Sequence, residues 1–151
     1  MMDLDEVDHN ILRALMSDAR MSSKALGEKL GLSQPATWRR IKRLKDAGVI
    51  KGRRLLLNRE KLGLGVTVFL GIKLATKGRV SLEDFERAVS AIPEVLSVEH
   101  ILGLYDYRLK VVARDIPDFE RILRRRIMTL PGAGQVEANV LLSEERRRGP
   151  I

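Results

Sequence analysis

The stretch from residue 33 to residue 48, SQPATWRRIKRLKDAG, constrains the fold of this chain more than any other. Ser33 is a favoured cap for a helix N-terminus, and Pro35 fits the first turn because the amide it lacks has no intrahelical partner there. Gly48 follows the last turn, where a left-handed cap is usual. Residues at i, i+4 and i+7 form its inward stripe, namely Thr37, Ile41 and Leu44. The stretch therefore predicts one helix with a defined start and end.

The face of this helix opposite the stripe is predicted to be basic. At about 100° per residue it carries Pro35, Arg39, Lys42 and Arg43, with Gln34 and Trp38 on the flanks near its start. A run of charge alone is usually a solvated surface. The neighbouring segment therefore decides what this face is for.

That neighbouring segment predicts a shorter helix from Ser22 to Leu30, capped by Ser22 or Ser23. Gly27 allows the two helices to cross closely, Gly31 supplies a positive φ in the turn, and Leu32 fills the angle between them. Three positions with separate mechanical roles indicate a helix-turn-helix. The unit favours DNA binding over a helical hairpin with another purpose.

A third helix is predicted near the N-terminus. Asp5 caps it, and Asp8 stands where it can reach back to the cap, as in a carboxylate version of the capping box. The inward stripe of this helix is Val7, Ile11, Leu12 and Leu15. It gives the helix-turn-helix a third helix on which to close a core.

After Gly48, Val49–Ile50 and then residues 53–57 predict an extended segment. Arg53 and Arg54 are either phosphate contacts beside the basic helix or ordinary strand-edge charges. The following segment, Asn58 to Gly65, is polar and glycine-bearing and predicts a hinge.

The formal charge of +8 is concentrated in the front of the chain. Residues 1–65 hold 14 Lys+Arg against 8 Asp+Glu, whereas residues 66–151 hold 14 against 12 and owe their excess to the terminal arginines 146–148. A basic front half suggests that this part meets a polyanion.

Several classes of protein are disfavoured by composition. The chain has no Cys, which excludes disulfides and thiolate metal sites and fits a reducing cytoplasm. Its two histidines, His9 and His100, lie far apart and show no metal-ligand spacing. We expect no metal, no cofactor, no membrane span and no export signal, and therefore a cytoplasmic location.

The second half predicts elements in the order βαββαβ. The strands are expected over residues 66–75, 95–102, 107–113 and 136–142, the helices over residues 81–92 and 115–130, and a turn at Thr76–Gly78. The tetrapeptide DFER occurs at Asp84 and again at Asp118, at the same point of the two helices. Two similar βαβ halves predict a ferredoxin-like fold, in which both helices cover one face of an antiparallel sheet.

The other face of this sheet is predicted to be bare and apolar. Leaving it in water would cost about 25 cal/mol per Å² of apolar surface. A second copy of the same sheet would cover it, so we expect a homodimer or a larger assembly.

With these features, the chain resembles the Lrp/AsnC (feast/famine) transcriptional regulators over essentially its whole length. The matching segments are LDEVDHNIL from Leu4, the run from Leu30 to Gly52, the KLGLG hinge, and a Gly103-x-x-Asp106 turn followed by Tyr107. The resemblance implies an α+β chain. Its parts are a helix-turn-helix domain, winged-helix-like, over residues 1–57, a hinge over 58–65, a ferredoxin-like RAM domain over 66–145 and a basic tail over 146–151.

The resemblance also implies a dimer formed through the RAM sheets, sometimes an octamer, that binds palindromic operator DNA. The base-edge or groove candidates carried over are Gln34, Pro35, Trp38, Arg39 and Lys42, and Arg40 and Arg43 are phosphate candidates; Ser22, Ser23, Ser33, Arg53 and Arg54 complete the expected interface. Arg and Lys donate to guanine and Gln pairs with adenine, while phosphate contacts supply salt-dependent affinity. Trp38 is alternatively a partly buried packing residue, because it lies only about 100° from the inward stripe.

The resemblance further implies a small effector, usually an amino acid, bound between RAM domains. Its expected site is Gly103, Leu104, Tyr105 and Asp106 with Val136 and Ala138 of the last strand. Asp106 would meet an α-amino group and the amides of residues 103–105 a carboxylate. Val136 and Ala138 stand where the family commonly has hydroxyl residues. The site is therefore expected to bind either a different ligand or no ligand. Alternatively, Gly103 only turns the hairpin and Asp106 only caps it.

Two other functions remain as alternatives. One is an architectural protein of the same fold that coats DNA without an effector. The other is an enzyme, because some haem-biosynthesis decarboxylases share the fold; they depend on His and Arg residues, and only His100 and Arg108 are available here. We expect no enzymatic activity.

Overall fold

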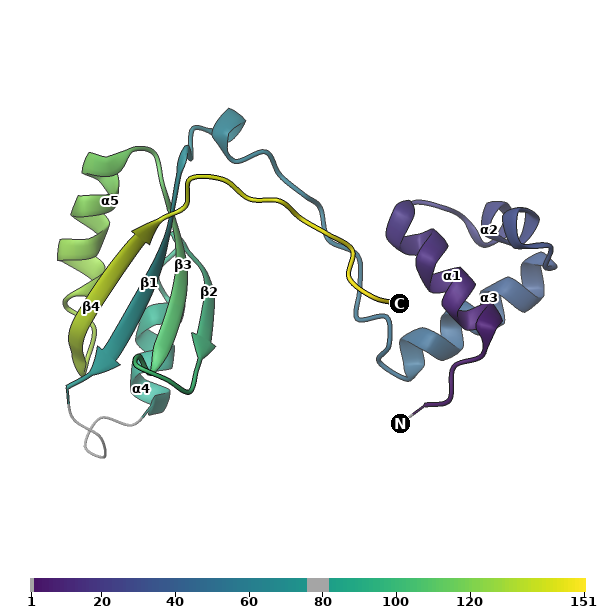
Figure 1. Ribbon diagram of the computed structural model, residues 1–151, viewed down its shortest axis with the longest axis horizontal. Coiled ribbons are helices and arrows are strands. Elements are labelled where there is room, and N and C mark those ends of the chain that lie inside the picture. Colours follow the sequence, from purple (N-terminus) through teal and green to yellow (C-terminus); the bar gives the residue numbers. More distant parts are fainter. Residues whose placement is uncertain (1, 76–81) are drawn as a thin grey trace. The chain divides into compact units, whose positions relative to one another are not determined.

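The computed structural model describes residues 2–75 and 82–151, and the turn predicted at Thr76–Gly78 and the start of the helix expected at Ser81 lie outside them. Contacts divide the chain into two compact units. The helical unit comprises residues 1–56 and 145–151, and the sheet unit comprises residues 57–144 (Figure 1). The predicted α+β fold class is confirmed.

Three helices form the helical unit: α1 (Glu6–Ser17), α2 (Ser23–Leu30) and α3 (Gln34–Asp46). Each begins at a predicted cap. The side chain of Asp5 accepts from the amide of Asp8, whose side chain accepts from the amide of Asp5, so the capping box is present. Ser22 and Ser33 accept from the amides of Ala25 and Ala36. Local sequence therefore specifies where each helix starts.

The turn between α2 and α3 has the predicted left-handed glycine and the predicted close crossing of the two helices. Gly31 ends α2 with φ 69°, and Gly48 follows α3 with φ 74°. A Cβ at Gly27 would lie 2.7 Å from the carbonyl oxygen of Leu32 and 2.9 Å from Oγ1 of Thr37. Only a glycine lets α2 approach α3 this closely. The core between the helices consists of Ile11, Ala14, Leu26, Ile41 and Leu44.

Residues 51–58, which include the extended segment expected over 53–57, form neither a helix nor a strand. Leu55, Leu56 and Leu57 in this stretch are exposed. An extended strand needs a partner for its backbone groups, and no strand among the described residues pairs with it. The predicted hinge contains a short 3-10 turn, η1 (Glu60–Leu62).

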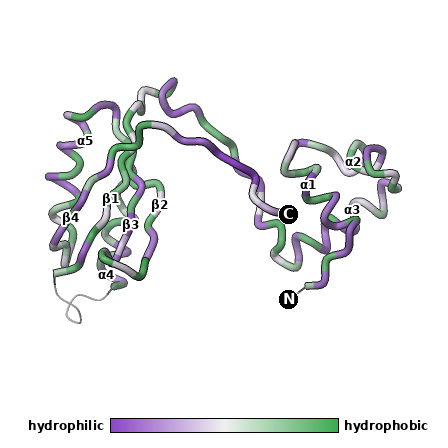
Figure 2. The backbone as a smooth tube through the Cα atoms, viewed as in Figure 1, coloured by the Kyte–Doolittle hydropathy of each residue, from purple (hydrophilic) through white to green (hydrophobic). Residues whose placement is uncertain are grey.

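The C-terminal tail, which is strongly hydrophilic before Gly149 (Figure 2), belongs to the helical unit. Nε of Arg13 donates to the carbonyl oxygen of Ile151 at 3.1 Å, and Arg148 donates to Oγ of Ser17 at 2.9 Å. With the tail included, the helical unit holds 15 Lys+Arg against 8 Asp+Glu, a net charge of +7, while the sheet unit holds 13 against 12.

The sheet unit has the predicted βαββαβ order. Its elements are β1 (Val66–Leu74), α4 (Leu82–Ser90), β2 (Val95–His100), β3 (Tyr107–Ala113), α5 (Ile116–Ile122) and β4 (Ala133–Val140). The strands run antiparallel in the order β2-β3-β1-β4, with both helices on one face (Figure 1). This is the ferredoxin-like arrangement that the DFER repeat predicts.

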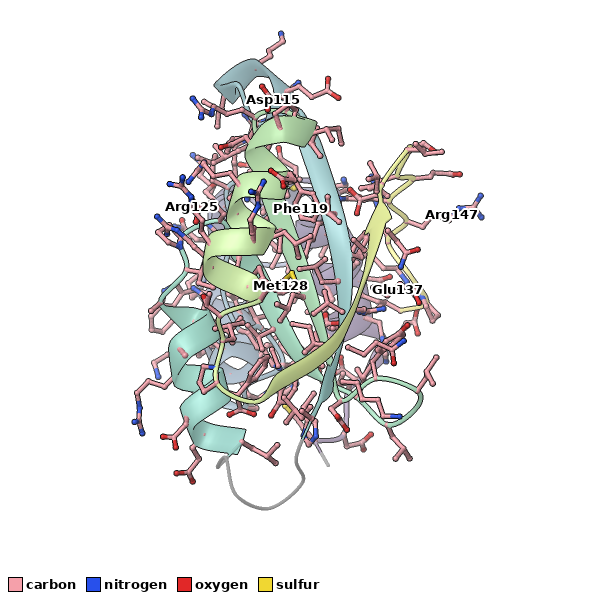
Figure 3. The ribbon with its side chains drawn as sticks, turned by 90° about the vertical axis from the view of Figure 1, so that its left-hand side faces the viewer. Asp115, Phe119, Arg125, Met128, Glu137 and Arg147 are labelled. Atoms are coloured by element: carbon pink, nitrogen blue, oxygen red, sulfur yellow. The ribbon has the colours of Figure 1, made fainter. Side chains whose placement is uncertain are left out.

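Both copies of the repeat serve the same core. Phe85 of α4 and Phe119 of α5 are buried against the sheet, where they meet alternate residues of β1 and β3 such as Leu70 and Leu109. Figure 3 shows Phe119 pointing from α5 toward the strands.

Several boundaries differ from prediction: β2 ends at His100 rather than at 102 and α4 ends at Ser90 rather than at 92, and the two elements that follow differ more. The last strand runs from Ala133 to Val140 rather than from 136 to 142, because it pairs with the far end of β1 beyond a register shift near Leu74. The second helix continues beyond α5 as a π turn, η2 (Leu123–Ile127). Helical periodicity does not distinguish such a turn from α-helix.

The face opposite the helices is more polar than expected. The register assigns to it Thr67, Phe69, Gly71, Lys73, Ser97, Glu99, Arg108, Lys110, Val112, Gln135, Glu137 and Asn139. We refer to these residues as the open face. The expectation of an apolar surface there is wrong, because nearly all apolar residues of the strands point toward α4 and α5.

Candidate nucleic-acid interface and effector site

Helix α3 carries three strips of side chains with separate roles. Thr37, Ile41 and Leu44 are buried against the core. Trp38, Lys42 and Lys45 line one flank, and Arg40 and Arg43 lie on the other. The helix can therefore present only part of its positive charge to a partner.

The flank with Trp38 faces a shallow cavity of about 380 Å³, which we call the α2–α3 groove. It brings together five predicted interface residues: Ser22, Ser23, Trp38, Lys42 and Arg53. Its cations and hydroxyl groups suit phosphate oxygens, and the N-terminus of α2 opens onto it. Arg20 and Lys45 also line it and were missed by the sequence analysis. The basic composition of the segment was the only sequence signal that pointed to these two residues. Their place in the groove depends on how the helices cross, which the sequence does not show.

Trp38 is 55% exposed, so about half of its surface remains free at the groove. Ile41, its neighbour in the lining, is buried. Part of the ring thus packs against the helical unit, as expected of a packing residue, and part is exposed to solvent, as a DNA contact requires.

The other predicted residues lie apart from this lining. Ser33 is committed to capping α3, and Gln34, Pro35 and Arg39 are exposed on the helix near its start. Arg54 is exposed but does not line the groove. Lys42 forms an ion pair with Asp46 one turn along at 2.7 Å.

Arg40 and Arg43 are engaged within the protein. Arg40 donates to Asp5 at 2.7 Å and to Asp8 at 2.9 Å, and Arg43 donates to the other oxygen of Asp8. The hydrogen bond from Arg40 lowers the pKa of Asp5, and the hydrogen bonds to Asp5 and Asp8 raise the pKa of Arg40. Both arginines were predicted to contact phosphate, and each has a carboxylate partner within the protein.

The turn predicted to hold an effector is anchored to β1 by Asp106. Its carboxylate accepts from the amide of Leu74 at 2.8 Å, and its own amide donates to the carbonyl oxygen of Ile72 at 2.9 Å. Its carbonyl oxygen accepts from the amide of Ile101. This geometry matches the alternative in which Asp106 caps the hairpin. Gly103 and Leu104 are exposed at its tip.

Tyr105 extends from this turn over β1. A Cβ at Gly71 would lie 2.7 Å from its ring, so only a glycine leaves room for the ring there. Its hydroxyl donates to Glu137 of β4, which raises the pKa of Tyr105 and lowers that of Glu137. Glu137 and Arg108 pair with Gly71 from either side. A guanidinium and a carboxylate therefore lie on either side of Gly71, beside the aromatic ring.

Val136 and Ala138 do not join this cluster. They pair with Ile72 and Leu70, which places them on the face covered by the helices, whereas Glu137 between them lies on the open face. Figure 3 shows Glu137 on the side of β4 away from α5. Strand alternation is the reason, and a shift of one position in the expected register was enough to miss Glu137.

The pair considered for the enzymatic alternative is also separated. His100 stacks on Tyr107 with ring centroids 4.9 Å apart, toward the helices, whereas Arg108 lies on the open face in an ion pair with Glu99. Among the described residues, no cluster of acidic or histidine side chains is arranged to hold a metal ion. No helix in that part of the chain is long and apolar enough to cross a bilayer.

Known protein families match both units of the chain. Residues 4–51 match the winged helix-turn-helix DNA-binding family, and residues 67–151 match the Lrp/AsnC ligand binding domain. A proline dehydrogenase transcriptional activator of Rhizobium radiobacter is 39% identical over 97% of this chain and 94% of its own. The Bkd operon transcriptional regulator of Pseudomonas aeruginosa is 35% identical over 99% of both chains.

Solved structures show the same fold. A transcriptional regulator from Neisseria meningitidis, in complex with L-Met, superposes with a TM-score of 0.89 at 30% identity, covering 96% of this chain and 94% of that one. AsnC of Escherichia coli gives a TM-score of 0.84 at 28% identity over 99% of both chains. Since a DNA-binding helix-turn-helix and a ligand-binding domain match in this order over nearly the whole length, the chain belongs to the Lrp/AsnC family of transcriptional regulators.

Proposed function

We propose that this regulator binds a palindromic operator sequence-specifically as a homodimer or a larger assembly such as an octamer, inserting α3 into the major groove. The supporting observation is the α2–α3 groove, where Trp38, Lys42 and the N-terminus of α2 converge. Two-fold symmetry of the protein would be mirrored in the operator. We infer a cytoplasmic location, because the proteins that match this chain are transcriptional regulators.

Within this interface the roles divide by chemistry. Gln34, Arg39 and Lys42 are exposed along the outer part of α3 and reach base edges. Ser22, Ser23, Lys45, Arg20 and Arg53 line the groove and contact phosphates.

The test is to recover bound DNA from the purified full-length protein, sequence it, and measure affinity for the enriched site and for random duplex at one fixed salt concentration. A specific regulator binds its site at least about 10³ times more tightly than random DNA. A ratio near one would favour the architectural alternative. Half-site spacing in the enriched sequences reports the assembly.

Matched variants locate the interface. Arg39→Ala removes an exposed arginine of α3, and Arg125→Ala removes an exposed arginine of the π turn in the sheet unit. We expect the first to weaken operator binding and the second to leave it unchanged. Equal effects of the two variants would contradict the assignment of α3.

We further propose that an amino acid or a similar zwitterion binds at the open face beside Tyr105 and modulates DNA binding. Glu137 meets its ammonium group and Arg108 its carboxylate, since both flank Gly71; the ligand takes the place of the Tyr105 hydroxyl on Glu137 and of Glu99 on Arg108, both of which are solvent-exposed contacts. Isothermal titration against the twenty amino acids tests this, with Glu137→Gln as the variant that loses the heat. No heat from any of them would argue against an amino-acid effector.

A further inference from the structure

The junction of α1 and α3 contains a buried carboxylate that the proposed function does not use. The side chain of Asp8 has 0% exposure. Its two oxygens accept from the amide of Asp5, from Arg40 and from Arg43. Asp8 therefore accepts three donors, two of them guanidinium groups of α3.

Such an arrangement restrains both the helix and its charges. A buried carboxylate is costly unless it is paired and hydrogen-bonded, so the two guanidinium groups cannot leave it freely. Arg40 and Arg43 are three positions apart and occupy one side of α3. Their common bond to Asp8 connects the middle of α3 to the first turn of α1.

The same bonds decide which cations are available to DNA. Arg40 is 31% exposed and shares its guanidinium between Asp5 and Asp8, and Arg43, at 50% exposure, donates to the buried Asp8. At the α2–α3 groove, Lys45 is exposed and Lys42 pairs with Asp46, which is 62% exposed, so this pair is open to solvent and contributes little. Each additional phosphate contact raises affinity for every DNA sequence alike. Two paired arginines therefore reduce sequence-independent binding without affecting base recognition.

We propose that Asp8 is a positioning residue for DNA recognition: it sets α3 against α1 and withholds Arg40 and Arg43 from phosphates, which keeps non-specific affinity low. This inference rests on the proposed DNA-binding function. It differs from the expectation that the two arginines contact phosphate, and the two ideas predict opposite salt dependences.

The test compares full-length wild type with Asp8→Asn by fluorescence anisotropy on the recovered operator and on random duplex over a salt series. The slope of log affinity against log salt changes by about 0.9 for each phosphate contact. We expect Asp8→Asn to steepen the slope on random duplex by about 0.9–1.8 as one or both arginines are freed. At about 0.15 M salt, this corresponds to about fivefold tighter random binding per freed arginine. These contacts strengthen operator binding by the same factor, so a fall in the operator-to-random ratio measures the second role of Asp8, the positioning of α3.

A purely structural role for Asp8 would lower the folded fraction but leave the salt slope of the folded protein unchanged. Circular dichroism at the assay temperature measures that fraction. A folded Asp8→Asn protein with the wild-type slope and ratio would overturn the proposal. Failure of the wild type itself to bind DNA would instead reject the proposed function, before Asp8 is tested.

A triple variant, Asp8→Asn with Arg40→Gln and Arg43→Gln, keeps the test decisive if the single variant does not fold. It removes the buried charge together with both partners, which proteins tolerate better than losing one partner. We expect its slope on random duplex to equal that of wild type. A slope shallower by about 0.9–1.8 would show that one or both arginines contact phosphates in the native protein and would overturn the proposal.

Discussion

Replacement of Gly27 by alanine is a direct test of the helix-turn-helix geometry. The added Cβ would lie 2.7 Å from the carbonyl oxygen of Leu32 and 2.9 Å from Oγ1 of Thr37. The nearer atom belongs to the backbone of the turn, so it cannot rotate away. Restoring a distance of 3.4 Å requires α2 and the turn to separate by 0.7 Å.

Two effects of opposite sign set the magnitude. Alanine in a helix interior is favoured over glycine by about 1 kcal/mol. Overpacking of a closely packed site costs about 1–3 kcal/mol. Because both contacts fall below 3.0 Å, the cost lies in the upper part of that range, about 2–3 kcal/mol, so that Gly27→Ala should destabilise the helical unit by about 1–2 kcal/mol after the alanine preference is subtracted.

Thermal unfolding followed by the fluorescence of Trp38, which lies in this unit and is the single tryptophan of the chain, measures the effect. For a unit of this size, each kcal/mol lowers the melting temperature by about 4–8 °C. Gly65→Ala, in the sheet unit and followed by circular dichroism, is the control for a glycine replacement without a clash, because its Cβ would lie 3.6 Å from the nearest atom. A Gly27→Ala protein as stable as wild type would refute the close crossing of the two helices.

Three further results are expected. The fluorescence emission of Trp38 should change on titration with operator DNA and return to that of the free protein when the salt concentration is raised. Emission that stays unchanged at saturating DNA would show that the DNA binds away from Trp38. Gly71→Ala should displace the Tyr105 ring and break its hydrogen bond to Glu137, so that the pKa of Tyr105 falls toward its ordinary value in an ultraviolet titration; an unchanged titration curve would contradict this. The hydrogen bonds of two arginines, Arg114 first, hold the pKa of Asp118 well below its ordinary value, so its stabilising contribution is complete above the unfolded pKa of about 3.9 and declines as pH falls below it. Urea unfolding of the sheet unit should therefore be less acid-sensitive in Asp118→Asn than in wild type, and identical pH profiles would exclude this role.

Much of the fold follows from local sequence. The capping residues Asp5, Ser22 and Ser33, together with the left-handed glycines 31 and 48, specify the three N-terminal helices without reference to the rest of the chain. The DFER repeat predicts the topology of the sheet unit, because two similar βαβ halves have few ways to share one sheet.

What sequence could not supply depends on distant contacts. Arg40 and Arg43 were assigned to phosphate because helical periodicity does not reveal that Asp8 of another helix lies against them. Glu137 was missed because the start of β4 depends on its pairing with β1. The polar character of the open face likewise emerged only when the register assigned each strand residue to a face.

The position of the C-terminal tail has a mechanical consequence. The chain leaves the helical unit before Leu57 and returns to it after Glu144, so two segments connect the units. At the sheet they start side by side, since the amide of Leu141 donates to the carbonyl oxygen of Thr67 at 2.9 Å. Residues 145–151 thus complete the helical unit from the far end of the chain, so their removal would take material from the helical unit and leave the sheet unit whole.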